Sequence, residues 1–239
     1  MQRKYFYSSV IGLALLTTVF GANLLIVAES QRNKNHSISS RLSEFGDSAR
    51  RRWKPYFEQS QIAYPPKAVT LVGFKEDKQL SVYATSLSGE SRLIRSFEVC
   101  AASGVSGPKL REGDFQVPEG IYAVTFLNPN SAYHVSLRLN YPNSFDKAHA
   151  ALDGRINLGG DIMIHGKCAS IGCLAMQDPS AEDLFVLAAD VGIKNIKVIL
   201  APFDLRVNQP SKHFYAQMPE WTPELYSNIK AELNKLPNL

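Results

Sequence analysis

The densest group of reactive side chains in the chain lies between residues 161 and 176. Within it, His165 stands eight residues before Cys173, which closes a Ser170-Ile-Gly172-Cys sequence. A thiol becomes a strong nucleophile as the thiolate, and a nearby imidazole favours that form. We expect the backbone amides of Gly172 and Cys173, with Ser170 in the same turn, to stabilise an oxyanion. The pattern therefore indicates a Cys-His site for acyl transfer.

The elements that must position these residues are predicted to be mainly β. Short β-branched and aromatic runs separated by turn residues fill residues 69–141, a spacing typical of a sandwich or barrel. Residues 178–191 have apolar side chains at helical spacing, with Asp178 as the predicted cap and Pro179 in the first turn. This predicts a β catalytic domain with one helix after Cys173, a strand at 196–203 and a C-terminal helix at 223–236.

Four segments are predicted along the chain. Residues 5–28 contain no charged side chain and are long enough to span a bilayer, so residues 1–28 are interpreted as a signal anchor or a signal peptide. Residues 29–66 are polar and end in two prolines, which indicates a linker with a short amphipathic helix. Residues 67–203 form the predicted catalytic domain, and residues 204–239 the tail with its helix.

Composition excludes several classes of protein. With 45% hydrophobic and 20% charged residues the chain is neither a coiled coil nor disordered throughout, and 3 cysteines are too few for a disulfide-rich miniprotein. The net charge of +4 comes from the first 65 residues, which hold 9 Lys and Arg against 4 Asp and Glu. A basic arm beside a nearly neutral body does not predict a nucleic-acid groove.

The motif around His165-Gly166 and Ser170-x-Gly172-Cys173 resembles the catalytic motif of the YkuD-type L,D-transpeptidases, and most closely the YafK-like branch of that family. The resemblance spans about residues 69–203. Further stretches that carry it are Gly107–Asp114, Pro118–Tyr122, Asn128–His134 and Tyr141–Asn143.

This resemblance implies that Cys173 is the nucleophile and His165 its general base, with no cofactor and no metal. The thiolate would attack the carbonyl on the L-centre of diaminopimelate in a peptidoglycan stem peptide, and the resulting thioester would pass to an amine acceptor. It also implies a periplasmic protein of the cell envelope, held in the inner membrane if residues 5–28 are not cleaved. His134, Tyr133 and Arg138 are the predicted substrate-binding residues, and Lys109 and Arg111 are candidates for holding a stem carboxylate.

Two departures from the broader family leave hydrolysis as an alternative to transfer. The spacing of eight residues between His165 and Cys173 is short, and Ile171 stands where many members have a second histidine. The YafK-like branch shares both features and includes an enzyme that detaches a peptidoglycan-linked lipoprotein. In the hydrolytic alternative, the same thioester is passed to water.

The cysteines leave two further questions open at this stage. Cys100 and Cys168 would be able to pair in an oxidising compartment, which would leave Cys173 as the odd thiol. A rival of another class is a non-catalytic peptidoglycan-binding or zinc-stabilised module. Its zinc ligands would be His165, Cys168 and Cys173, together with His134 or His149.

Overall fold

The computed structural model describes residues 35–237, and residues 36–237 belong to one compact unit. Residues 1–28, the predicted signal anchor or signal peptide, lie outside the described part of the chain. No helix within residues 35–237 combines the length and the apolar composition that crossing a bilayer requires.

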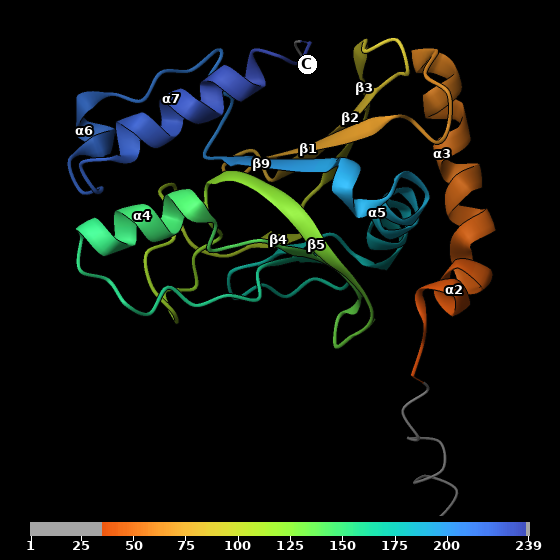
Figure 1. Cartoon of the computed structure of the whole chain (residues 1–239), viewed down its shortest axis with the longest axis horizontal. Helices are drawn as coiled ribbons and strands as arrows, with labels where there is room; N and C mark the ends of the chain where they lie inside the picture. Colours follow the sequence, from red (N-terminus) through yellow and green to blue (C-terminus); the bar gives the residue numbers. More distant parts are fainter. Residues whose placement is uncertain (1–34, 238–239) are drawn as a thin grey trace, which may run out of the picture. The chain divides into compact units, whose positions relative to one another are not determined.

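The described residues are built around a mixed β-sheet, which confirms the mainly β class. Its nine strands are hydrogen-bonded in the order β3-β2-β1-β9-β5-β6-β7-β8-β4, and the neighbours β1, β9 and β5 lie side by side in Figure 1. The strands are β1 (Ala68–Phe74), β2 (Gln79–Thr85), β3 (Ser91–Glu98), β4 (Ala101–Ala102), β5 (Gly120–Ser131), β6 (His134–Leu139), β7 (Met163–His165), β8 (Leu174–Ala175) and β9 (Ile196–Ala201).

One long strand, β5, joins the two halves of the sheet. Its first residues, Gly120 to Ala123, pair antiparallel with β9, whereas Val124 and the residues after it pair antiparallel with β6. The register shifts between Val124 and Phe126, as at a β-bulge, which bends a strand and increases its twist. β5 therefore connects the strands that were predicted to form a sandwich or barrel into one sheet. The short strands β7 and β8 follow β6 in that sheet.

Strands β1 and β9 are covered on both faces, which explains their nearly continuous apolar sequences. In β1, Leu71 belongs to the main core between the two halves of the sheet, and its neighbour Val72 points to the opposite face. That opposite face is covered by α7 (Thr222–Leu233) through Leu225, Tyr226 and Ile229. The predicted C-terminal helix is thus confirmed as part of a second core.

The helix predicted after Cys173 is also confirmed, as α5 (Asp178–Val191). Its apolar side chains Leu184, Phe185 and Leu187 are buried in the main core. Pro179 lies in the first turn and Gly192 follows the last residue, as helix-boundary preferences predict.

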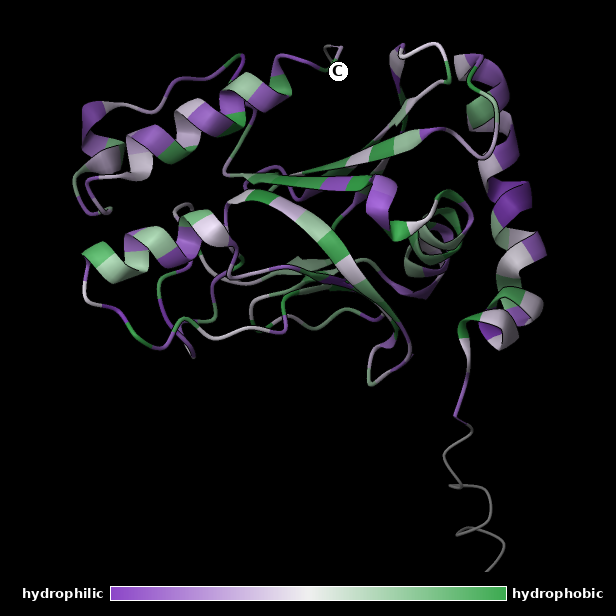
Figure 2. Cartoon of the chain, in the orientation of Figure 1, coloured by the Kyte–Doolittle hydropathy of each residue, from purple (hydrophilic) through white to green (hydrophobic). Residues whose placement is uncertain are grey.

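Residues 36–60 are not a linker. They form α2 (Ile38–Arg41), the π-helix η1 (Leu42–Gly46) and α3 (Asp47–Ser60), and α3 packs against α5 and β3 (Figures 1 and 2). Trp53 of α3 is completely buried, and its Nε1 donates to the carbonyl oxygen of Asp183 over 2.8 Å. The helix is amphipathic as predicted, but its apolar side is part of the main core.

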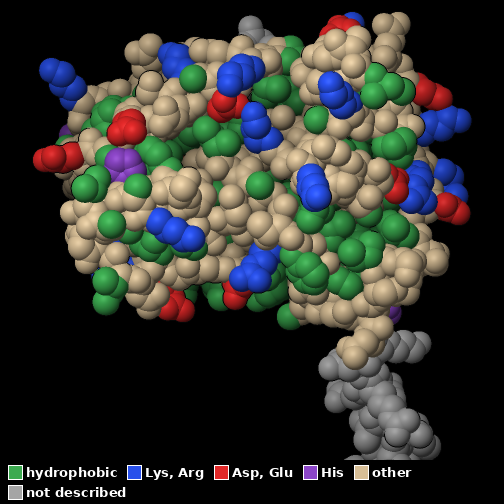
Figure 3. Space-filling view, in the orientation of Figure 1, with side chains coloured by type: hydrophobic (Ala, Val, Ile, Leu, Met, Phe, Trp, Pro, Cys, Tyr) green, Lys and Arg blue, Asp and Glu red, His purple; other side chains and the backbone are tan. Residues whose placement is uncertain are grey.

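Three short helices complete the described part of the chain. α4 (Ser144–Leu152) was not predicted, although Asn143 and Asp146 form a capping box at its start. The 3-10 helix η2 (Ile193–Asn195) precedes β9, and α6 (Lys212–Tyr215) precedes α7. On the face drawn in Figure 3, Lys and Arg side chains are spread singly or in small groups, with acidic groups among them.

Candidate functional site

His165 is the last residue of β7, and its position is fixed by strand pairing on both sides. It lies opposite Ser136 of β6 and opposite Ala175 of β8. Its carbonyl oxygen also accepts a hydrogen bond from Met176 N over 2.8 Å. The residue is 1% exposed, so only a small part of its ring reaches the surface.

The imidazole of His165 is oriented by its own neighbour and by an aromatic ring. Nδ1 donates to the carbonyl oxygen of Gly166 over 2.6 Å, and the Tyr133 ring stacks on the imidazole with centroids 4.4 Å apart. Because a carbonyl oxygen only accepts, Nδ1 carries the proton of the neutral ring and Nε2 is free to take one. Burial lowers the pKa of His165, which makes the neutral base the main form at pH 7.

Cys173 lies immediately before β8, the strand that runs parallel to β7. The register pairs Leu174 with Ile164 and Ala175 with His165, so the candidate thiol and imidazole come from neighbouring strands. The thiol is half-buried and donates to the carbonyl oxygen of Asp161, with Sγ and O 3.7 Å apart. Burial raises the pKa of this thiol, so the resting pair is a neutral thiol and a neutral imidazole.

Ser170 organises the turn that carries Cys173. Its Oγ donates to the Cys173 carbonyl oxygen over 2.7 Å and accepts from the amides of Cys173 at 3.2 Å and Gly172 at 3.4 Å. Gly172 has a φ of 123°, a conformation that favours glycine. That these two amides form an oxyanion hole stays a prediction; in this structure both donate to Ser170 Oγ.

The open question about the cysteines is settled by a disulfide bond between Cys100 and Cys168. Cys168 lies in the loop between His165 and Cys173, so this bond ties that loop to the strand region around β4. Cys173 is the free cysteine of the three in the chain.

Both candidate residues line one pocket of about 460 Å³. Its walls come from the loops before β5, between β5 and β6, between α4 and β7, and between β7 and β8. Besides Cys173 and His165, the lining consists of Lys109, Glu112, Gly113, Phe115, Asn128, Ser131, Ala132, Tyr133, Gly159, Gly160, Asp161, Ile162, Met163 and Ile171.

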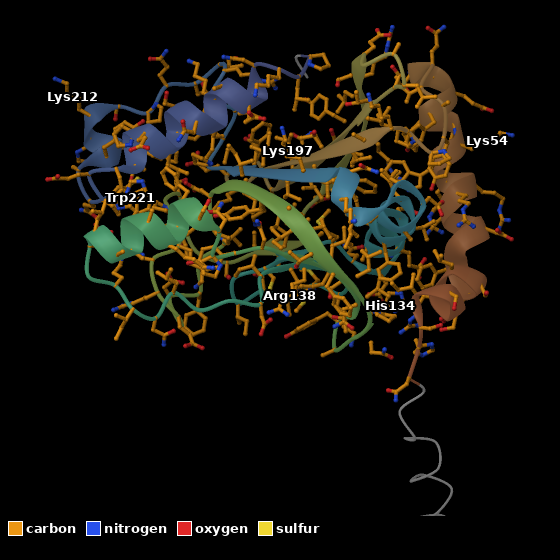
Figure 4. All side chains as sticks on the ribbon, in the orientation of Figure 1. Lys54, His134, Arg138, Lys197, Lys212 and Trp221 are labelled. Carbon is orange, nitrogen blue, oxygen red and sulfur yellow. A yellow bond between two sulfur atoms is a disulfide. The ribbon has the colours of Figure 1, made fainter. Side chains whose placement is uncertain are left out.

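The structure places one of the three predicted substrate-binding residues in the pocket lining and the other two outside it. Tyr133 lines the pocket, whereas Arg138 stands beside it and pairs with the pocket residue Asp161 over 2.8 Å. His134 is outside the pocket lining, because a φ of 78° turns its ring toward α5, where Nε2 lies 3.1 Å from Glu182 Oε1 (Figure 4). Its predicted substrate contact is therefore wrong.

The zinc arrangement is also contradicted. Cys168 is bonded to Cys100, and His149 stacks on Trp221 with ring centroids 4.8 Å apart, near the C-terminal helices (Figure 4). Within residues 35–237, no group of three or more His, Cys, Asp and Glu side chains is arranged to hold a metal ion.

Of the candidates for holding a carboxylate, Lys109 lines the pocket and Arg111 does not. The Lys109 ammonium group is itself paired with Asp114 and donates to the carbonyl oxygen of Arg111 over 2.8 Å. This ammonium group already has an acidic partner at the pocket wall, so a substrate carboxylate would have to share the ammonium group with Asp114.

Asp178 is a residue of the site whose function the sequence did not reveal. It was predicted to cap α5, but the helix is preceded by Gln177 with a φ of 62° and has no side-chain cap. The Asp178 carboxylate instead accepts from Lys167 N over 2.8 Å and so holds the turn that follows His165. An aspartate followed by a proline is typical of a helix start. Nothing in the local sequence distinguishes an aspartate that caps the helix from one that accepts a hydrogen bond from a distant amide.

In the comparison with family models, residues 70–198 match the YkuD L,D-transpeptidase catalytic domain. This range covers more than half of the chain and contains both His165 and Cys173. It begins in β1 and ends in β9, so it includes the sheet but neither α3 nor α7.

Curated proteins and solved structures give further similarities. "Putative L,D-transpeptidase YafK" of Escherichia coli (strain K12) is 32% identical over 157 residues, which cover 64% of this chain and 61% of that protein. The chain thus matches less than two thirds of the relative's length. The helical cell shape determining protein Pgp2 from Campylobacter jejuni is 25% identical, with a TM-score of 0.45 over 62% of this chain and 54% of that one. On the strength of the family-model match, the chain belongs to the YkuD family of L,D-transpeptidase catalytic domains.

Proposed function

We propose that this protein is a cysteine-dependent L,D-transpeptidase that acts on peptidoglycan stem peptides, with Cys173 as the nucleophile and His165 as the general base. The observation that carries the proposal is that these two side chains line one pocket while the other two cysteines are bonded to each other. Membership of the YkuD family supports the reaction class.

The first half-reaction forms a thioester. The thiol proton passes from Cys173 Sγ to Nε2 of His165, and the thiolate attacks the carbonyl on the L-centre of diaminopimelate. The bond from this carbonyl carbon to the nitrogen beyond it then breaks, and the imidazolium returns its proton to the departing amine. Throughout these steps, the Gly166 carbonyl oxygen accepts from Nδ1 and stabilises the charged ring.

In the second half-reaction, an acceptor amine attacks the thioester. His165 takes one proton from that amine and returns it to Sγ, which leaves a new amide bond and a free Cys173 thiol. Tyr133, Lys109 and Arg138 are proposed to contact or border the donor stem, since the first two line the pocket and the third pairs with Asp161 at its wall.

Hydrolysis is the second candidate because Cys173 is only half-buried, so water is able to reach a thioester on it. Chemistry up to the thioester is the same. When the departing amine belongs to a peptidoglycan-linked lipoprotein, the hydrolytic reaction would detach that lipoprotein.

We further propose that the protein acts in the periplasm, held to the inner membrane through residues 5–28. The disulfide between Cys100 and Cys168 supports an oxidising compartment, where such bonds persist. Labelling of intact and permeabilised cells with a membrane-impermeant probe on an added surface tag tests this location.

The test of the activity is mass spectrometry of defined stem tetrapeptides incubated with the protein and an amine acceptor. Transfer predicts a product that contains the acceptor, and hydrolysis predicts a shortened stem with the added mass of water. Cys173→Ala is expected to abolish both products and to leave the circular dichroism spectrum unchanged. Product formation by Cys173→Ala at the normal rate would contradict the assignment of the nucleophile.

A further inference from the structure

One wall of the pocket is a loop without strand pairing of its own. Residues 103–119 connect β4 to β5, and the part from Lys109 to Phe115 supplies four of the pocket's lining residues. A segment of this kind keeps one shape only if other groups satisfy its backbone. The structure therefore has to provide a support beneath it.

Lys75, directly after β1, supplies much of this support. Its Nζ donates to three carbonyl oxygens of the loop, those of Val105 at 2.7 Å, Val117 at 2.9 Å and Gly107 at 3.1 Å. The Lys75 side chain is 6% exposed. Because these carbonyl oxygens come from both ends of the loop, one ammonium group holds the two ends together.

Glu119 balances the charge of Lys75 and adds a further contact with the loop. Its Oε1 lies 3.1 Å from Lys75 Nζ and accepts from Gly107 N over 2.8 Å. The carboxylate is fully buried, so the loss of any hydrogen-bond or ion-pair partner would leave a buried charge without full compensation. Burial lowers the pKa of Lys75, and the contact with Glu119 opposes that shift.

The second carboxylate oxygen of Glu119 connects this network to the C-terminal helix. Tyr226 of α7 donates its hydroxyl to Glu119 Oε2 over 2.6 Å, and the tyrosine is 3% exposed. A chain of contacts therefore runs from α7 through Glu119 and Lys75 to the loop that forms the pocket wall. α7 lies outside the region that matches the family model.

We propose that Tyr226 is a positioning residue that acts through Glu119 and Lys75 to hold the loop 105–117 in the shape that binds the donor stem. The proposal rests on the proposed function for its kinetic consequence, although the effect on the loop itself does not depend on catalysis. Tyr226 is not one of the residues that line the pocket. It therefore acts on donor binding and not on the chemical step.

The test compares Tyr226→Phe with Tyr215→Phe in the full chain. The rings of Tyr215 and Tyr226 pack together with centroids 5.9 Å apart, but the Tyr215 hydroxyl has no hydrogen bond to any described residue, which makes it a matched control. For Tyr226→Phe we expect the KM for the donor to rise about tenfold while kcat changes less than about twofold, the pattern of weakened ground-state binding. Tyr215→Phe should leave both constants unchanged.

Amide hydrogen exchange supplies a readout that needs no turnover. Residues 105–117 are expected to exchange faster in Tyr226→Phe and in Glu119→Gln than in the wild type and in Tyr215→Phe. If the wild-type protein showed no activity on any stem peptide, the proposed function would be wrong. The exchange test of the positioning role would still apply, because it does not depend on turnover. Unchanged exchange of the loop in Tyr226→Phe, or a fall in kcat at constant KM, would overturn the positioning role.

Discussion

Nδ1 of His165 lies 2.6 Å from the carbonyl oxygen of Gly166, the next residue in the chain. The group that orients the imidazole is thus part of the backbone, and it carries no negative charge. A carboxylate in this place would stabilise the imidazolium and favour a preformed pair of thiolate and imidazolium. The neutral carbonyl does so less strongly, and burial of both groups favours their uncharged forms.

The first prediction concerns the pH dependence of kcat/KM. We expect the rate to rise as His165 loses its proton, with a midpoint below the ordinary histidine pKa near 6.5, because burial lowers the pKa of His165. The rate should fall again above the raised pKa of Cys173, because the thiolate then forms without giving a proton to His165 for the departing amine.

Alkylation of Cys173 by iodoacetamide separates this neutral pair from a preformed ion pair. The rate should follow the thiolate fraction and increase up to and beyond pH 9, since the raised pKa of the thiol places its ionisation above the ordinary range. Denatured protein under the same conditions provides the reference for an unshifted thiol. Full reactivity already at pH 5 would be evidence for the ion pair.

The second prediction concerns the turn after His165. A Cβ on Gly166 would lie 2.7 Å from the carbonyl oxygen of Tyr133 and 2.5 Å from a carboxylate oxygen of Asp178. Because one of these atoms is backbone, the turn has to move, and with it the carbonyl oxygen that holds the imidazole. Gly166→Ala should therefore destabilise the fold by about 1–3 kcal/mol and reduce kcat more than tenfold.

Gly160→Ala is the control for the stability measurement, since a Cβ at Gly160 meets nothing within 4 Å. Urea unfolding followed by tryptophan fluorescence gives the free energy of unfolding for both variants. A stability equal to that of Gly160→Ala and a kcat equal to that of the wild type would show that the Gly166 turn tolerates a side chain.

Local patterns predicted the elements that carry the site, because those elements are specified by nearby residues. The period of the apolar residues indicated β1, β2, β9 and α5, and the spacing of His165 and Cys173 indicated a reactive pair. The role of Ser170 was missed because the direction of an amide within a turn depends on the turn's φ and ψ angles. His134 was assigned to the pocket for the same reason, since its φ of 78° was not visible in the strand pattern.

The helix α3 was predicted as part of a linker because its charges are paired far along the chain. Arg50 pairs with Asp190 and Arg52 with Asp183, both over 2.7 Å. In the sequence these arginines form a basic cluster with Asp47 as the only acidic residue within four positions, which is typical of a solvated arm. Only the three-dimensional structure brings the carboxylates of α5 next to them.

The third prediction tests the disulfide between Cys100 and Cys168. Thiol titration of the unfolded, unreduced protein should find one thiol per chain, and three after reduction. The bond closes a separation of 68 residues, so Cys100→Ser with Cys168→Ser should lower the free energy of unfolding by about 4 kcal/mol. The double variant should also lose activity, because its loop between His165 and Cys173 is no longer tied to Cys100. A count of three thiols before reduction would contradict the bond.

The fourth prediction concerns the boundary of the folded unit. Trp53 is completely buried against Phe57 and Phe97, with ring centroids 5.8 Å and 5.6 Å away. Trp53→Ala should therefore cost about 3–5 kcal/mol, which is the usual range for removing a buried aromatic side chain. Lys54→Ala on the exposed side of the same helix (Figure 4) should change the stability by less than about 0.5 kcal/mol.

Removal of the whole helix extends this argument. A chain that begins at residue 67, the predicted start of the catalytic domain, would leave Asp183 without its contact to Arg52 and would expose the core surface that Trp53 covers. We expect this shorter chain to aggregate or to unfold at a much lower temperature, whereas a chain that begins at residue 36 should keep a single cooperative transition. Equal melting temperatures for the two chains would mean that α3 is a dispensable arm, as its sequence had indicated.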